Sequence, residues 1–479
     1  MLFNSFDFLI FFIVFYVLFF WSKGTIRQII LFLSSCIFYA WFIPKYLIIL
    51  FVTIAIDYYA AIKIEDSTTE KERKLSLILG IINTCAVLFI FKYQNFFIGN
   101  INWISGSNFS YWNIILPIGL SFHTFQSLSY VIDIYRNKIK AERNLLIYSN
   151  YVMMFPQLVA GPIERAGHLI PQLKASLYSK LSYSDFSIGI TLFFYGLFKK
   201  MVVADNIGPY VNAVYDNYTH HSSMTLLMAS MLFAIQIYAD FSGYSDMAIG
   251  VARVLGFKFN DNFKTPYFSK SVTEFWRRWH ISLSSWLRDY LYYPLVLGWG
   301  KISKKKMYYS TLITFSLIGL WHGANWTFIA FGFIHGIYLV VEMLTENIRK
   351  WIINFTHINK LPLLLHLIQT SIVFILVSLS FIFFRSNTFN QAIFIFKKII
   401  SSISIKELNF LDTNGFTVLS FSIIILFLCE YLIFNKYSIE EIYNMHKGKL
   451  LCSLITISAI LLVLSFGWWG GASFIYFQF

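Results

Sequence analysis

The sequence is poor in charged residues. Only 13% of its 479 residues are Asp, Glu, Lys or Arg, whereas 57% are hydrophobic and the mean hydropathy is +0.62. Soluble globular domains carry about 25% charged residues. This shortage of charge excludes an ordinary soluble protein and indicates a chain that lies mostly in lipid.

Cysteine is also scarce. The chain has four cysteines, and Cys36, Cys85, Cys429 and Cys452 all lie inside apolar runs. No Cys-x-x-Cys pair occurs, so the spacing favours neither a disulfide framework nor a metal site. We therefore expect no metal cofactor.

Acidic residues are fewer than basic ones. There are 24 Asp and Glu against 38 Lys and Arg, which gives a net charge of +14. The basic excess lies in loops between apolar runs, chiefly 22–28, 136–143, 301–306 and 436–449. Such loops stay in the cytoplasm, so topology explains the charge better than a nucleic-acid partner does. The same loops would also suit an anionic cytosolic substrate.

Long apolar runs recur along the whole chain, and about 20 residues suffice for one membrane crossing. The runs are 8–21, 29–43, 46–62, 76–92, 112–132, 145–160, 186–204, 224–254, 308–345, 363–384, 415–434 and 451–469. Runs 224–254 and 308–345 have room for two helices, or for one helix and a re-entrant turn. We predict an all-α polytopic membrane protein with about 11–13 transmembrane helices plus re-entrant and interfacial helices. Because no internal repeat or linker occurs, we expect residues 1–479 to form a single membrane domain.

Segment 271–290 has an amphipathic rather than a uniformly apolar pattern. Ser271 and Glu274 have the spacing of a capping box, which indicates a helix start. On a helical wheel the apolar face is Trp276, Trp279, Leu283, Trp286, Leu287 and Tyr290, and the polar face is Arg277, Arg278, Ser282, Ser284, Ser285, Arg288 and Asp289. This pattern predicts one helix lying along the membrane interface. His280, at the border of the two faces, is either an ordinary interfacial residue or a residue that looks into a cavity.

A second histidine lies at membrane depth. His322 stands between Gly319 and Gly323 in the stretch GLWHGANW, where small residues let helices approach closely. Ionisable groups in lipid are costly and need a reason, and a neutral imidazole is what a general base requires. A hydrogen bond between helices is an equally good explanation. Asn325, one turn away, would orient the ring.

Other polar groups in apolar surroundings favour structural roles. Asp240 and Asp246 are six residues apart and lie on different helix faces, so they are not a paired-carboxylate site. We expect ion pairs instead, with Lys199 and Lys200 or with the two arginines of the 271–290 segment as partners.

Prolines interrupt the run 155–173. Pro156, Pro162 and Pro171 exclude an uninterrupted helix there. The polar residues Glu164 and His168, together with Arg165, are best explained by a capped loop at the interface.

Four stretches carry a resemblance to a known family. They are FPQLVAGPIER (155–165), YADFSGYSDMAIG (238–250), FNDNFKTPYFSKSVTEFWRRWHISLSSWLRDYLYYPL (259–295) and GLWHGANWTFIAFGFIHG (319–336). With them the chain resembles the membrane-bound O-acyltransferases, in the bacterial branch of alginate and peptidoglycan O-acetyltransferases and the D-alanyl transfer protein of teichoic acids. The resemblance implies a fold with a central tunnel in the bacterial inner membrane.

The resemblance also implies a reaction: an acyl group passes from a cytosolic thioester, acetyl-CoA in the acetyl branch, to a hydroxyl. The family's near-invariant histidine maps onto His322, and a second motif position maps onto His280. The donor site would consist of Arg277, Arg278, Arg288, Trp276 and Asn325, with the arginines near the CoA phosphates.

The tail 471–479 ends in FIYFQF, which looks like the motif that ends small partner proteins of the D-alanylation system. By that resemblance Tyr476 would relay the acyl group, or a serine of a periplasmic SGNH-hydrolase-like partner would receive it, before a cell-surface polysaccharide is acylated. Transfer of D-alanyl or another acyl group is the first alternative. A non-enzymatic transporter or a scaffold of an envelope complex is the second.

Overall fold

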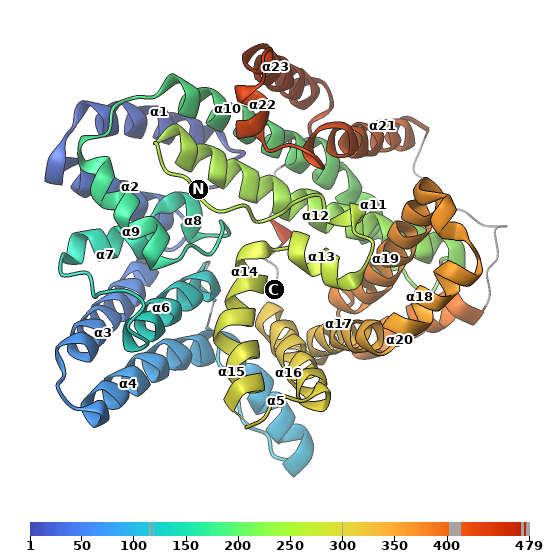
Figure 1. Ribbon diagram of the computed structural model, residues 1–479, viewed down its shortest axis with the longest axis horizontal. Coiled ribbons are helices and arrows are strands. Elements are labelled where there is room, and N and C mark those ends of the chain that lie inside the picture. The colour runs from blue at the N-terminus through green and yellow to red at the C-terminus, as the bar shows by residue number, and fades with distance from the viewer. Residues whose placement is uncertain (115, 118, 299, 402–412, 471–473, 476–479) are drawn as a thin grey trace. The chain divides into compact units, whose positions relative to one another are not determined.

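The computed structural model describes residues 1–479 except 115, 118, 299, 402–412, 471–473 and 476–479. The described residues form helices and connecting loops, without a β-strand (Figure 1). Their contacts divide the chain into two compact units, residues 1–193 with 244–260 and residues 194–243 with 261–479. Helices α10 (Tyr183–Phe198) and α12 (Ser223–Val254) contribute residues to both units.

The first unit is built from helices near the N-terminus. They are α1 (Phe6–Trp21), α2 (Gly24–Ala40), α3 (Leu47–Asp66), α4 (Glu70–Leu88), α5 (Gln94–Ser105), α6 (Leu120–Tyr135), α7 (Leu145–Met153), α8 (Phe155–Leu158) and α9 (Ala166–Ala175). Helices α3, α4 and α6 pack against one another. The predicted interruption is confirmed, since α8 ends at Leu158 and helix resumes only at Ala166. Of the three prolines only Pro162 lies in the break, because Pro156 is in the first turn of α8 and Pro171 is inside α9.

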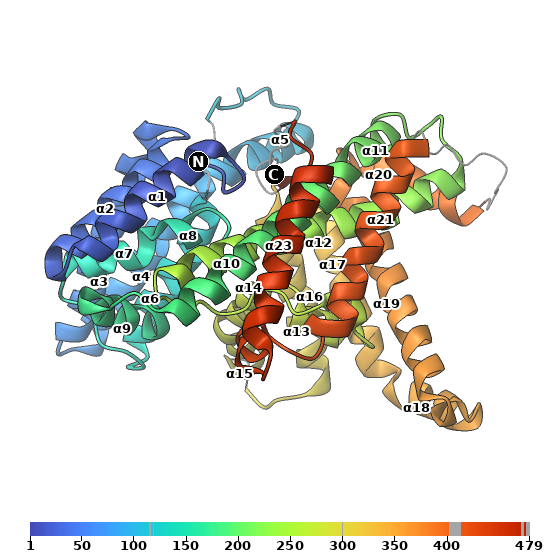
Figure 2. The same cartoon turned by 90° about the horizontal axis from the view of Figure 1, so that it is seen from above.

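The second unit holds the remaining helices. They are α11 (Asp205–Asp216), α13 (Val272–Arg278), α14 (Ile281–Leu287), α15 (Tyr293–Gly298), α16 (Lys304–His322), α17 (Trp326–Leu344), α18 (Glu346–Phe355), α19 (Pro362–Arg385), α20 (Phe389–Ser401), α21 (Thr413–Cys429), α22 (Ile439–Asn444) and α23 (Gly448–Phe466). Helices α21 and α23 run side by side, with the rings of Phe421 and Phe466 5.7 Å apart (Figure 2).

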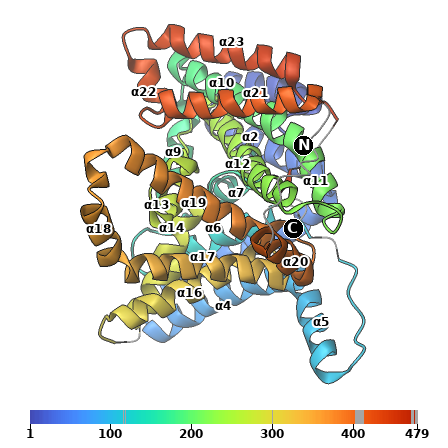
Figure 3. The same ribbon diagram turned by 90° about the vertical axis from the view of Figure 1, so that its right-hand side faces the viewer.

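Helices α16 and α17 form the closest pair of the second unit (Figure 3). A Cβ atom on Gly319 would lie 2.1 Å from the carbonyl oxygen of Phe328, and one on Gly332 would lie 2.0 Å from that of Phe315. Only glycine permits this approach. The predicted role of the small residues in this region is confirmed.

Eight helical segments of the described chain are long and apolar enough to cross a membrane. They are Pro44–Asp66, Glu70–Ser105, Tyr183–Asp216, Ser223–Val254, Trp326–Leu344, Pro362–Arg385, Gly415–Leu432 and Gly448–Phe466, and Phe6–Trp21 and Gly24–Ala40 are shorter apolar helices. The protein is therefore an all-α polytopic membrane protein. Run 224–254 is one helix, and run 308–345 is two helices with a break after His322. The sequence count of 11–13 also included run 145–160, which forms the short α7 and α8.

The prediction of a single interfacial helix over 271–290 is wrong. The helix starts as expected, with the Ser271 side chain accepting from the Glu274 N–H, but α13 ends at Arg278 and α14 begins at Ile281. Between them His280 takes a left-handed conformation, with φ +44° and ψ 55°. Loop 262–264 pairs with the break: the N–H of Ile281 donates to the Asn262 carbonyl, and the N–H of Lys264 donates to the Arg278 carbonyl.

The indole rings predicted at the lipid interface are buried inside the protein. Trp276, Trp279 and Trp286 are 7%, 3% and 6% exposed. The reason is the same break, because a straight helix would keep one face outward whereas the bent segment turns its apolar side into the second unit.

Candidate active site

One amide oxygen holds His280. The Oδ1 atom of Asn262 lies 3.0 Å from His280 Nδ1, and it also accepts from the Ser282 hydroxyl at 2.8 Å and from the Ser282 N–H at 3.4 Å. Because this oxygen is an acceptor in all three contacts, His280 Nδ1 carries the hydrogen. The lone pair of a neutral ring is then on Nε2.

Burial keeps His280 neutral. The residue is 0% exposed, and desolvation lowers the pKa of its imidazole to about 3. A neutral ring with its lone pair on Nε2 can accept a hydrogen bond at ordinary pH, whereas the lowered pKa makes it a weak base. Of the two alternatives for His280, the structure excludes the interfacial one, since the break described above turns the ring into the protein.

His322 is the last residue of α16 and is 5% exposed. Its ring centroid lies 4.9 Å from the Trp321 ring and 5.3 Å from the Phe384 ring. The Trp321 ring also lies 6.1 Å from the ring of His280. The structure therefore brings the two predicted histidines against one tryptophan.

The C-terminal segment lies close to the same rings. Phe474 and Ile475 are 1% and 7% exposed. The Phe474 ring is 5.9 Å from Phe241, whose ring in turn stands edge-on to His280 at 4.7 Å. A continuous series of aromatic contacts thus runs from the tail to His322. Tyr476, the predicted relay, lies outside the described residues.

The three predicted arginines differ in their surroundings. Arg278 forms an ion pair with Glu274 at 2.8 Å and donates to Thr265 Oγ1 and Asn435 Oδ1 at 3.1 Å each. Arg277 is exposed. The Arg288 side chain is 56% exposed and contacts its neighbour Asp289 at 3.1 Å. Two of the three guanidinium groups are therefore accessible to a phosphate.

Trp276 and Asn325 contact protein groups. Trp276 Nε1 donates to His335 Nδ1 at 3.2 Å. Asn325 is the N-cap of α17, where its side-chain oxygen accepts from the N–H of Thr327 at 3.1 Å.

Sequence reasoning missed His335. This residue is 0% exposed, and its Nε2 lies 2.8 Å from Ser380 Oγ. Because Nδ1 accepts from Trp276, Nε2 carries the hydrogen and donates to the hydroxyl. The ring joins α13, α17 and α19. A signal was present, since His335 lies in the stretch FGFIHG, where a histidine among apolar residues needs a partner.

The predicted ion pair of Asp240 is present. Lys200 lies 2.6 Å from Asp240 and 2.7 Å from Asp205, which confirms a structural pair for Asp240. In the first unit, Arg253 pairs with Asp185 at 2.7 Å.

The loop around Glu164 is capped as expected. The Glu164 carboxylate accepts from the N–H of Asn260 at 2.6 Å and contacts His168 Nδ1 at 2.7 Å. Glu164 raises the pKa of His168 by stabilising its charged form.

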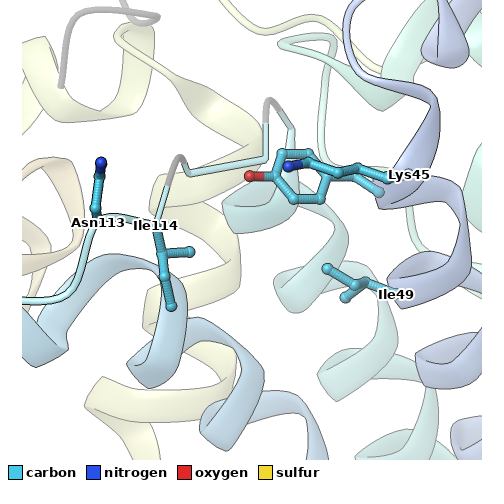
Figure 4. Close-up of a pocket in the computed structure, with 5 residues that line it drawn as sticks. Lys45, Ile49, Asn113 and Ile114 are labelled. Carbon is cyan, nitrogen blue, oxygen red and sulfur yellow. The ribbon is translucent and has the colours of Figure 1, made fainter.

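Two cavities are lined by residues other than the two histidines. In the first unit a pocket of about 370 Å³ has Lys45 and Ile49 on one side and Asn113 and Ile114 on the other (Figure 4). In the second unit an apolar pocket of about 390 Å³ lies between α11, α12 and α21. Within the described residues no group of three or more His, Cys, Asp or Glu is suited to hold a metal ion.

The fold and this site define a class: a multi-pass helical membrane protein with two buried histidines beside one tryptophan. The chain belongs to the MBOAT, or membrane-bound O-acyltransferase, family, whose model matches residues 137–386. It is accordingly an acyltransferase. The predicted resemblance is confirmed.

Named relatives agree with this assignment. The probable alginate O-acetylase AlgI of Pseudomonas aeruginosa is 34% identical over 93% of this chain and 82% of its own length. The peptidoglycan O-acetyltransferase of Helicobacter pylori is 35% identical over 76% of this chain and 72% of its own length. The teichoic acid D-alanyltransferase of Bacillus subtilis is 28% identical over 50% of this chain and 62% of its own length.

Proposed function

We propose that this protein is an O-acetyltransferase of the bacterial inner membrane that moves acetyl from cytosolic acetyl-CoA to a hydroxyl on the opposite side, and finally to a cell-surface polysaccharide. The observation that carries the proposal is the contact of His280 and His322 with Trp321, together with the contact of Phe474 with Phe241 beside His280. Relatives named as acetylases cover more of this chain than the D-alanyltransferase does, which favours acetyl as the cargo.

His322 acts as the general base in this proposal. Its imidazole takes the proton of the acceptor hydroxyl while the oxygen attacks the thioester carbonyl. The carbon–sulfur bond then breaks, and the CoA thiolate takes the proton back from the imidazolium. The products are an ester and free CoA thiol, so no further reactant is needed.

His280 orients the donor or assists proton movement. The Asn262 oxygen accepts from Nδ1, so Nε2 is the ring atom that would perform that task. Exclusion of water by the surrounding aromatic rings limits hydrolysis of the thioester.

The donor would enter from the cytosol, where Arg277 and Arg288 present exposed guanidinium groups for the CoA phosphates. The rest of the donor site would be formed by Arg278, Trp276 and Asn325. The protein contacts described above would hold these side chains in place.

The acceptor is Tyr476 as a transient aryl ester, or a serine of a periplasmic SGNH-hydrolase-like partner that passes acetyl to the polysaccharide. In either case the thioester and the hydroxyl meet across a passage through the membrane domain. Positioning of the two reactants then supplies much of the rate enhancement.

The test compares His322→Ala with His220→Ala, an exposed histidine in the same unit. Purified proteins of equal abundance are assayed for acetyl-CoA consumption, and cells for polysaccharide O-acetylation by mass spectrometry. General bases contribute roughly 10²–10⁴-fold, so His322→Ala should lose at least that factor while His220→Ala stays active. Retained activity in His322→Ala would remove the base role. Tyr476→Phe tests the relay in the same assays, and full activity of that variant would leave a partner's serine as the acceptor.

A further inference from the structure

Ile475, one of the two described residues of the tail 471–479, is bound to a buried carboxylate. The backbone N–H of Ile475 donates to Asp240 Oδ2 at 2.7 Å, and Asp240 is 1% exposed. A hydrogen bond from the main chain does not depend on which side chain stands at 475. The contact therefore holds the main chain at position 475, and the ring contact of Phe474 with Phe241 sets which residue lies there.

Asp240 is itself held in place. Its other carboxylate oxygen lies 2.6 Å from Lys200 Nζ, and the same ammonium lies 2.7 Å from Asp205 Oδ1. All three side chains are at most 5% exposed. One ammonium thus serves two carboxylates, and a buried anion is costly unless donors surround it. The N–H of Ile475 is such a donor. It adds a hydrogen bond to the Asp240 carboxylate, whose cation Lys200 is shared with Asp205.

The attachment lies next to the histidines. Asp240 and Phe241 are neighbours in α12, so the residue that binds the Ile475 N–H directly precedes the residue whose ring contacts both Phe474 and His280. Any shift of the tail by one residue would break the hydrogen bond and move the Phe474 ring off Phe241.

We propose that Asp240, supported by Lys200, docks the C-terminal segment and sets its register for acyl transfer. Asp240 is a positioning residue, because it acts on the reaction through the tail. This inference rests on the proposed function for its catalytic consequence, whereas the docking itself is independent of it. The tail is then a built-in part of the acceptor machinery.

Docking is tested by trimming the tail with a carboxypeptidase on the full-length protein in detergent, with intact mass as the readout. Wild type, Asp240→Asn and the control Asp216→Asn, an exposed acid in α11, have identical tails, so their peptide bonds are equally cleavable. Release of residues up to and including Ile475 should be about ten-fold faster or more in Asp240→Asn and unchanged in Asp216→Asn. Equal rates in all three proteins would overturn the docking.

A second pair of variants leaves the Lys200–Asp240 pair intact, which matters if Asp240→Asn folds poorly. Ile475→Pro removes the N–H, whereas Ile475→Ala keeps it and serves as the matched control. We expect kcat for acetyl transfer to be about ten-fold or more lower in Ile475→Pro than in Ile475→Ala, with equal KM for acetyl-CoA in the two variants. Equal kcat in the two variants would overturn the positioning role.

The proposed function and the proposed docking can be disproved separately. If the proposed function is wrong, no variant shows acetyl transfer that depends on His322, yet Asp240→Asn still exposes the tail to trimming. If the docking is wrong, trimming rates stay equal while transfer that depends on His322 persists in Ile475→Pro.

Discussion

The backbone N–H of Ile475 and the Oδ2 atom of Asp240 are 2.7 Å apart although 235 residues separate them in the chain. This contact joins the C-terminal segment to α12. Since Asp240 also binds Lys200, the tail, α12 and the helical segment Lys199–Ala204 meet at one buried ionic cluster. The cluster and the two histidines are linked through Phe241.

Lys200→Met should destabilise the protein strongly. The variant leaves the carboxylates of Asp205 and Asp240 buried together without their cation, and removal of one partner of a buried pair costs about 3–5 kcal/mol. Thermal unfolding in detergent checks this, with the exposed Lys397→Met as the control. Unfolding midpoints that agree between the two variants would contradict a structural role for the cluster.

Trp276→Phe should destabilise the packing of α13 against α17 and α19 without removing an aromatic ring. The variant loses the indole N–H that His335 Nδ1 accepts, and a buried acceptor left without its donor costs about 1–3 kcal/mol. The same substitution at Trp326, which is 55% exposed, should change little. Differential scanning calorimetry of both variants checks this prediction. An unchanged unfolding midpoint for Trp276→Phe would show that this hydrogen bond contributes nothing to stability.

His280 should make stability depend on pH. Its folded pKa of about 3 lies below the usual value of 6.5, so the unfolded state binds more protons between these two pH values. The stability that His280 contributes is therefore complete above about pH 6.5 and is lost as the pH falls toward 3, with a slope of at most about 1.4 kcal/mol per pH unit.

The variant His280→Asn isolates this contribution, because asparagine tolerates the left-handed backbone better than most residues. Unfolding midpoints measured from pH 7.5 down to pH 4.5 should fall less steeply in His280→Asn than in wild type. Parallel profiles would mean that His280 is not kept neutral by burial. The neutral ring also predicts that activity above pH 5 shows no inflection from this residue.

The three arginines of the predicted donor site should differ in what their substitution changes, either KM for acetyl-CoA or stability. Arg277→Ala and Arg288→Ala remove exposed groups, so we expect KM for acetyl-CoA to rise several-fold, most at low ionic strength, with the unfolding midpoint unchanged. Arg278→Ala instead breaks contacts with Glu274, Thr265 and Asn435 and should lower the midpoint. Steady-state kinetics and thermal unfolding of the three variants check the division. A uniform effect on KM would place Arg278 at the donor as well.

Local patterns in the sequence predicted what depends on neighbouring residues. The apolar composition requires helices in lipid, where backbone groups have no other partners, so the all-α membrane fold followed directly. The helix start at Ser271, the interruption by prolines after Leu158 and the close approach at Gly319 were predictable for the same reason, because each depends on residues a few positions apart.

The tertiary structure decided what depends on residues far apart. A helical wheel describes 271–290 as one amphipathic helix, but Asn262 binds both the backbone and the ring at the break and turns His280 into the protein. Likewise, the composition of the tail suggested only an aromatic end, whereas the structure shows Ile475 bound to Asp240, which also pairs with Lys200. Sequence by itself determined the lipid-embedded helices and named both histidines. Only the tertiary structure showed that both histidines contact one tryptophan, that His280 turns inward and that Ile475 binds Asp240. These features depend on long-range contacts, because no periodicity in one segment encodes a hydrogen bond to another.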